Sequence, residues 1–81
     1  MDDNKIEVTI KLFAYYRDGK FDTKTENYPL GTTIQQVMDT IGLDLLNDPL
    51  GILLVNGCHA KPSDTLHNND TISIFPMLGG G

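Results

Sequence analysis

Thr71-Ile72-Ser73-Ile74-Phe75 alternates polar and apolar residues, and so does Ile6-Glu7-Val8-Thr9-Ile10-Lys11-Leu12 near the other end of the chain. This period of two is typical of a strand that buries one of its faces. The sequence has 81 residues, a length that allows one domain. We therefore expect the first and last strands to share one sheet and one core.

The residues after the first strand predict a returning partner strand. Asp18-Gly19 indicates a hairpin turn, and Phe21 to Tyr28 is expected to be a polar strand near an edge of the sheet. Pro29-Leu30-Gly31 then ends that strand.

A short helix is predicted from Thr33 to Ile41. Thr33 followed by Gln36 fits a capping box, and Gly42 falls where a helix ends in a left-handed residue. One face of this helix carries an apolar stripe at the spacing i, i+3, i+4 and i+7. Its members are Ile34, Val37, Met38 and Ile41.

The second half of the chain predicts short strands and turns. Leu43 to Leu50 is expected to be a loop beneath the helix, followed by a short buried strand, Ile52 to Val55. Asn56-Gly57 indicates a tight turn into Cys58-His59-Ala60. Two further turns are expected at Lys61-Pro62-Ser63-Asp64 and Asn68-Asn69-Asp70.

This order of elements is strand, strand, helix, then two or three strands, which predicts an α+β fold. A mixed sheet with one helix on one face, and with parallel first and last strands at its centre, is the β-grasp or ubiquitin-like arrangement. We expect one β-grasp domain over residues 1–75 and a flexible glycine-rich tail over residues 76–81.

Two aromatic residues are expected on the face of the sheet without the helix. If Ile72 and Ile74 face the helix, Phe75 points away from it, and Phe13 does the same after the first strand. An exposed apolar patch on a small protein usually marks a partner surface. The alternative is that strand twist and loops cover the two rings.

The residues Pro76-Met77-Leu78-Gly79-Gly80-Gly81 follow the last strand directly. We expect nothing in this stretch to form ladder bonds or bury much surface, so that Gly79 to Gly81 are mobile. Such a tail spans about 17 Å at roughly 3.4 Å per residue, and lacking side chains it fits a narrow slot. A carrier whose terminus enters another protein's active site needs these properties. A frayed end or a cloning remnant is the alternative.

Composition and charge argue against several functions. Eleven acidic and six basic residues give a net charge of −5, the wrong sign for binding nucleic acid or an anionic membrane. The single cysteine, Cys58, excludes an intramolecular disulfide and a four-cysteine metal site. With His59 and His67 it forms no recognisable zinc pattern, and it lacks an orienting group for a Cys–His nucleophile. We expect no catalytic or metal site and, with no secretion signal visible, a cytoplasmic location.

The sequence resembles the MoaD/ThiS family of ubiquitin-like sulfur carriers from Ile6 to Gly81. The matching pieces include Leu12-Phe13-Ala14 with Arg17, and Gly31-Thr32-Thr33-Ile34 at the start of the helix. Val55-Asn56-Gly57, Asn69-Asp70-Thr71-Ile72 and Phe75-Pro76 before Gly80-Gly81 complete the set. Leu-Phe-Ala followed by Arg is closer to the MoaD branch, the small subunit of molybdopterin synthase.

This resemblance implies a carrier protein, not an enzyme in isolation. A ubiquitin-activating-type enzyme would use ATP and magnesium to adenylate Gly81, and a sulfur donor would convert it to a thiocarboxylate. The thiocarboxylate would donate its sulfur in the synthesis of molybdopterin, for a molybdenum or tungsten cofactor. The carrier itself would hold no cofactor. Gly79 and Gly80 would thread the tail into the partner. The residues implied to bind a large synthase subunit or an equivalent acceptor enzyme are Phe13, Phe75, Pro76, Met77 and Leu78.

Three other functions remain open at this point. A ThiS-like carrier would serve thiamine thiazole synthesis, and a ubiquitin-like modifier would join Gly81 to lysines. A ubiquitin-like binding module would use no terminal chemistry.

Overall fold

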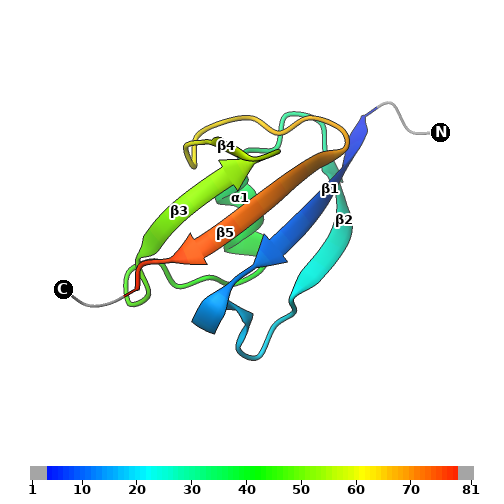
Figure 1. The fold of residues 1–81 in the computed structure, drawn as a ribbon. Helices are drawn as coiled ribbons and strands as arrows, with labels where there is room; N and C mark the ends of the chain where they lie inside the picture. Colours follow the sequence, from blue (N-terminus) through cyan, green and yellow to red (C-terminus); the bar gives the residue numbers. More distant parts are fainter. Residues whose placement is uncertain (1–3, 79–81) are drawn as a thin grey trace.

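The computed structural model describes residues 4–78 and contains five strands, one α-helix and one 3-10 helix (Figure 1). In chain order these elements are β1 Lys5–Leu12, η1 Ala14–Arg17, β2 Thr23–Pro29, α1 Ile34–Thr40, β3 Leu50–Val55, β4 Cys58–His59 and β5 Asp70–Pro76.

All five strands form one sheet in the order β2-β1-β5-β3-β4. Strands β1 and β5 are parallel at its centre, and the other neighbouring pairs are antiparallel. The helix α1 covers one face of this sheet, and within residues 4–78 no helix covers the other face (Figure 1). This is the β-grasp fold that the order of elements predicted, with β2 at an edge as expected.

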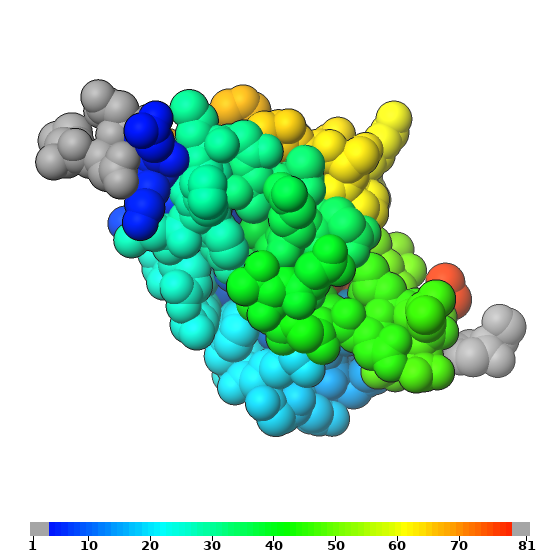
Figure 2. Space-filling view, turned by 180° about the vertical axis from the view of Figure 1, so that it is seen from behind, coloured from blue at the N-terminus to red at the C-terminus, as the bar shows by residue number. Residues whose placement is uncertain are grey.

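The core lies between the sheet and α1. Every second residue of the central strands is buried, including Val8, Ile10, Ile72 and Ile74 at 0% exposure. The helix covers them with Ile34, Val37 and Met38. Seen from the helix side, α1 and the loop that follows it cover the middle of the molecule (Figure 2).

The helix begins with the predicted capping box and ends at the predicted glycine. The Thr33 hydroxyl accepts a bond from the Gln36 N–H at 3.3 Å, and the Gln36 side chain accepts one from the Thr33 N–H at 2.8 Å. Gly42 has a φ of +79°, the left-handed conformation that closes a helix. Ile41 is the C-cap and only half-buried, so the apolar stripe weakens at its last member.

The connection between β1 and β2 is longer than the predicted hairpin turn. Asp18-Gly19 does lie at the centre of a turn, closed by a bond from the Lys20 N–H to the Arg17 carbonyl at 2.9 Å. However, η1 precedes this turn and β2 starts only at Thr23, not at Phe21. The extra residues exist because Tyr16 of η1 packs into the core and Phe21 packs against it.

Strand β3 is less buried than its apolar sequence predicted. Leu53 is buried, whereas Ile52 is 47% exposed. The helix covers only one face of β3, so alternate residues of the strand lie on the open face. The loop before it is closer to expectation, because Leu43, Leu45 and Leu50 pack against the core.

The turns around β4 and β5 lie where the sequence placed them. Asn56 and Gly57 both have a positive φ and connect β3 to β4. The Asp64 N–H bonds to the Lys61 carbonyl at 2.9 Å, and Asn69 has a φ of +70° just before β5.

Candidate functional site

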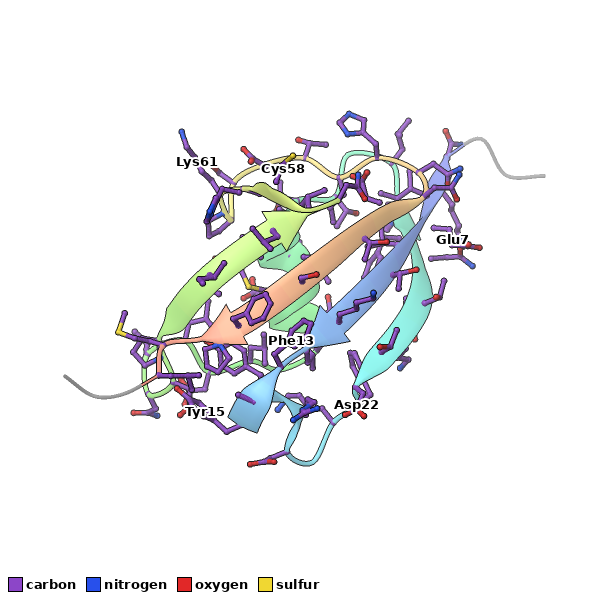
Figure 3. The ribbon with its side chains drawn as sticks, in the orientation of Figure 1. Glu7, Phe13, Tyr15, Asp22, Cys58 and Lys61 are labelled. Atoms are coloured by element: carbon purple, nitrogen blue, oxygen red, sulfur yellow. The ribbon has the colours of Figure 1, made fainter. Side chains whose placement is uncertain are left out.

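Phe13 and Phe75 stack on the open face of the sheet. Their ring centroids are 4.1 Å apart and their planes differ by 11°. Phe75 alternates with buried Ile74 and Pro76 along β5, which places its ring on the side away from α1. Figure 3 shows the Phe13 side chain on the same open side of the sheet. The predicted placement of both rings is therefore confirmed, while a role in partner binding stays a prediction.

Ile52 extends this surface from the neighbouring strand. It pairs with Phe75 in the β3–β5 register, and directly paired residues point to the same face. We call Phe13, Phe75 and Ile52 the apolar patch. Ile52 was missed because four consecutive apolar residues look like a strand buried on both faces.

Hydrogen bonds to the Met77 backbone hold the chain that follows the apolar patch. The Met77 N–H donates to the Pro49 carbonyl at 2.9 Å, and the Tyr15 hydroxyl donates to the Met77 carbonyl at 2.9 Å. Pro76 belongs to β5, pairs with Leu50 and is buried. The expectation that this stretch forms no ladder bonds is therefore wrong for Pro76 and Met77.

We call Pro76 and Met77 the tail root. Of the five residues expected to bind a partner, Pro76 is thus the one with a buried side chain. Met77 and Leu78 are exposed, and Leu78 is the last residue that the structure describes. The expectations for Gly79, Gly80 and Gly81 lie outside the described residues.

Gly51 allows β3 to approach the tail root closely. The β3–β5 register shifts between Leu50 and Ile52, which leaves Gly51 in a β-bulge opposite Pro76. A Cβ atom at Gly51 would lie 2.6 Å from the Pro76 carbonyl oxygen and 2.9 Å from the Met77 nitrogen. Glycine is needed here because these neighbours are backbone atoms that cannot move aside easily.

The helix η1 is itself fixed to the loop before β3. The buried Tyr16 hydroxyl donates to the Asp48 carbonyl at 2.7 Å. Burial raises the pKa of Tyr16 above its ordinary value, and the charges of Tyr15 and Asp48 raise this pKa further. Tyr16 therefore remains a neutral hydrogen-bond donor through the physiological range.

Arg17, which matches the family pattern, lies near this site at the surface. Its Nε is 3.9 Å from the Asp22 carboxylate and 3.4 Å from the Ala14 carbonyl oxygen. Both side chains of the Arg17–Asp22 pair are exposed, so the attraction between them is weak. Arg17 therefore forms a surface ion pair with Asp22.

Cys58, His59 and His67 lie at the opposite end of the sheet. Cys58 pairs with Val55, which in turn pairs with Ile72 at the start of β5, and Figure 3 shows Cys58 far from Tyr15. Within residues 4–78 there is no group of three or more His, Cys, Asp or Glu side chains that could hold a metal ion. Nor does any helix in that range have the length and apolarity to cross a membrane.

The fold closely resembles several solved structures. A Pyrococcus furiosus protein provisionally assigned as molybdopterin converting factor, subunit 1, superposes with a TM-score of 0.73 at 21% identity, covering 90% of this chain and 99% of its own. A Haloferax volcanii protein solved in solution gives a TM-score of 0.74 at 21% identity, with 100% and 92% covered. Small archaeal modifier protein 1 of the same organism gives 0.69 at 19% identity, with 90% and 99% covered.

At these identities the structural likenesses establish the fold alone. A search of the curated proteins finds no match to the chain. The model of the ThiS family matches residues 10–81, most of the sequence. This chain therefore belongs to the ThiS family of ubiquitin-like sulfur carriers.

Proposed function

We propose that this protein is a sulfur carrier that is activated at the Gly81 carboxylate. The observation that carries the proposal is the position of the tail root, which follows Phe75 directly and lies where the apolar patch ends. A partner that covers Phe13 and Phe75 would meet the start of the tail at the edge of the same contact. Family membership supplies the class of function, and this geometry supports its mechanism.

The chemistry begins with an unreactive carboxylate. A ubiquitin-activating-type enzyme joins the Gly81 carboxylate to the α-phosphorus of magnesium-bound ATP and releases pyrophosphate. Hydrosulfide then attacks the acyl carbon, forming the C–S bond as the C–O bond to AMP breaks and AMP leaves. The product is a thiocarboxylate on Gly81, and the carrier's own contribution is to present that group to each partner.

We further place the carrier in molybdopterin synthesis. Leu12-Phe13-Ala14 followed by Arg17 supports this choice, because the same arrangement marks the small subunit of molybdopterin synthase. The stacked aromatic pair then serves as the contact for the large synthase subunit. Incubating the thiocarboxylate form with that subunit and its pterin precursor is expected to return the carrier to its carboxylate mass.

A second candidate function is protein modification. The likeness to small archaeal modifier protein 1 favours it, although at 19% identity this likeness concerns the fold. In this function a lysine amine, not sulfur, displaces AMP from Gly81 and an isopeptide bond forms.

Intact mass of the protein recovered from its native cell tests the proposal. Replacement of one oxygen by sulfur adds about 16 Da, whereas conjugation adds the mass of a whole acceptor protein. Conjugates need a protease other than trypsin, because Lys61 precedes Pro62 and the last good tryptic site is Lys24. Chymotryptic cleavage after Leu78 would leave three glycines, about 171 Da, on a modified lysine.

Each outcome selects one function. A gain of about 16 Da supports the sulfur carrier, and triglycine-modified lysines in other proteins support the modifier. If neither appears in cells that make the activating enzyme, the protein is a binding module without terminal chemistry.

A further inference from the structure

Both hydrogen-bonding groups of the Met77 backbone are occupied by groups from other parts of the chain. The Pro49 carbonyl accepts from its N–H, and the Tyr15 hydroxyl donates to its C=O, each at 2.9 Å. The Met77 side chain is nevertheless 58% exposed. The contacts therefore restrain the direction of the backbone without burying the residue.

Tyr15 is held in place on its other side. Its ring meets the ring of Tyr16 edge to face, with centroids 5.6 Å apart and planes at 72°. Tyr16 is anchored in the core and bonded to the Asp48 carbonyl, next to Pro49. Tyr15 and Pro49, the two partners of Met77, thus belong to one connected unit made of η1 and the loop before β3.

We propose that the Tyr15 hydroxyl and the bulge at Gly51 hold the tail root in the geometry that the adenylating enzyme accepts. Tyr15 is then a positioning residue, since it acts through its hydrogen bond to the Met77 backbone. This inference rests on the proposed function, the activation of Gly81. It adds a specific device that directs the tail toward the activating partner.

Folding alone does not require the hydrogen bond between Tyr15 and Met77. Tyr15 is 38% exposed, so its hydroxyl could bond to water instead of Met77 at little cost in stability. The contact matters because four residues of the sequence, 78–81, follow Met77, and four residues can reach at most about 14 Å at roughly 3.4 Å per residue. With so short a reach, the direction in which the backbone leaves Met77 limits the region that Gly81 can reach.

A tail that already leaves in the accepted direction loses less conformational freedom on binding. Loss of the contact between Tyr15 and Met77 should therefore weaken binding of the tail by the enzyme and leave the chemical step unchanged. The expected signature is a higher KM for the carrier at a nearly constant kcat.

The test is ATP–pyrophosphate exchange by the cognate adenylating enzyme, measured against carrier concentration. Tyr15→Phe keeps the ring and removes only the hydroxyl. We expect its KM to rise about three- to tenfold, the effect of one ordinary hydrogen bond, with kcat within about twofold of wild type. Tyr28→Phe is the matched control, because Tyr28 pairs with Ile6 at the far end of the sheet, and its KM should not change.

Gly51→Ala tests the same geometry from the other side. Its Cβ would collide with the Pro76 carbonyl and force the tail root away from β3. We expect a rise in KM at least as large as that of Tyr15→Phe. Circular dichroism, recorded under the conditions of the assay, shows whether the variant is folded. If Gly51→Ala does not fold, Tyr15→Phe alone decides.

An unchanged KM in Tyr15→Phe, with wild-type carrier activated normally, overturns the inference and leaves the proposed function standing. A lowered KM also overturns it, since the contact would then restrain the tail against uptake. If wild-type carrier itself is not activated, the proposed function fails and the positioning role fails with it.

Discussion

The two faces of the sheet consist of the same strands but have different roles. On the face covered by α1, Val8, Ile10 and Ile74 are fully buried. On the open face, Thr9 bonds to Thr25 through their hydroxyls at 3.1 Å, and the stacked pair of Phe13 and Phe75 lies at the end near the tail root. The covered face supplies the stability of the domain, whereas one end of the open face is apolar without belonging to the buried core.

Neighbouring residues of β1 provide the test with the largest expected effect. Ile10→Ala removes a fully buried side chain and should lower the free energy of unfolding by about 2–4 kcal/mol. Thr9→Ala, one residue away on the open face, should cost less than about 1 kcal/mol. Urea unfolding measures both, and equal losses would contradict the contrast between the faces.

Phe75→Glu addresses the open face itself. If Phe13 and Phe75 contact the large synthase subunit, as proposed, a charge at position 75 should weaken that binding by about 2 kcal/mol or more, roughly 30-fold in Kd. The variant should still fold, because Phe75 lies outside the buried core. Calorimetric titration gives the affinity and circular dichroism the fold. Unfolding of the variant would show instead that the ring belongs to the core.

The helix offers a comparison within the covered face. Val37 is fully buried, whereas Ile41 is the half-buried C-cap. Val37→Ala should cost about 1–3 kcal/mol and Ile41→Ala distinctly less, even though isoleucine loses more atoms. The midpoints of thermal unfolding rank the two variants. A larger loss of stability in Ile41→Ala would contradict the structure, because Ile41 would then be packed more tightly than Val37.

The smallest effect concerns pH. Burial raises the pKa of Tyr16 and of Tyr28 above the ordinary value near 10. Their neutral forms therefore stabilise the fold fully below about pH 10, and this stability is lost as the pH rises through the raised values. In Tyr16→Phe the free energy of unfolding, measured by denaturant titration at each pH, should fall less steeply with pH above about 10. If the free energy of unfolding falls equally steeply with pH in wild type and variant, Tyr16 does not cause the loss of stability.

The sequence predicted those elements whose signals are local. Alternation identified β1 and β5, and the capping box with Gly42 placed both ends of the helix. The same alternation assigned Phe13 and Phe75 to the open face, because side-chain direction along a strand follows directly from the period of two.

Features that depend on contacts between distant segments could not be predicted in this way. The 3-10 helix exists because Tyr16 finds a place in the core and an acceptor at Asp48, neither of which is adjacent in sequence. The bulge at Gly51 and the hydrogen bonds of Met77 likewise arise where three segments meet. Pro76 looked like the end of the ladder, yet a proline at this position still pairs with Leu50.

The central claim, activation at Gly81, is tested most directly by a reconstitution followed by intact mass. The full chain and a chain lacking Gly80 and Gly81 are each incubated with the adenylating enzyme, magnesium-ATP and sulfide. We expect the full chain to gain about 16 Da and the shortened chain, although folded, to gain nothing. A full chain that gains no mass, or a shortened chain that gains as much, would contradict the account.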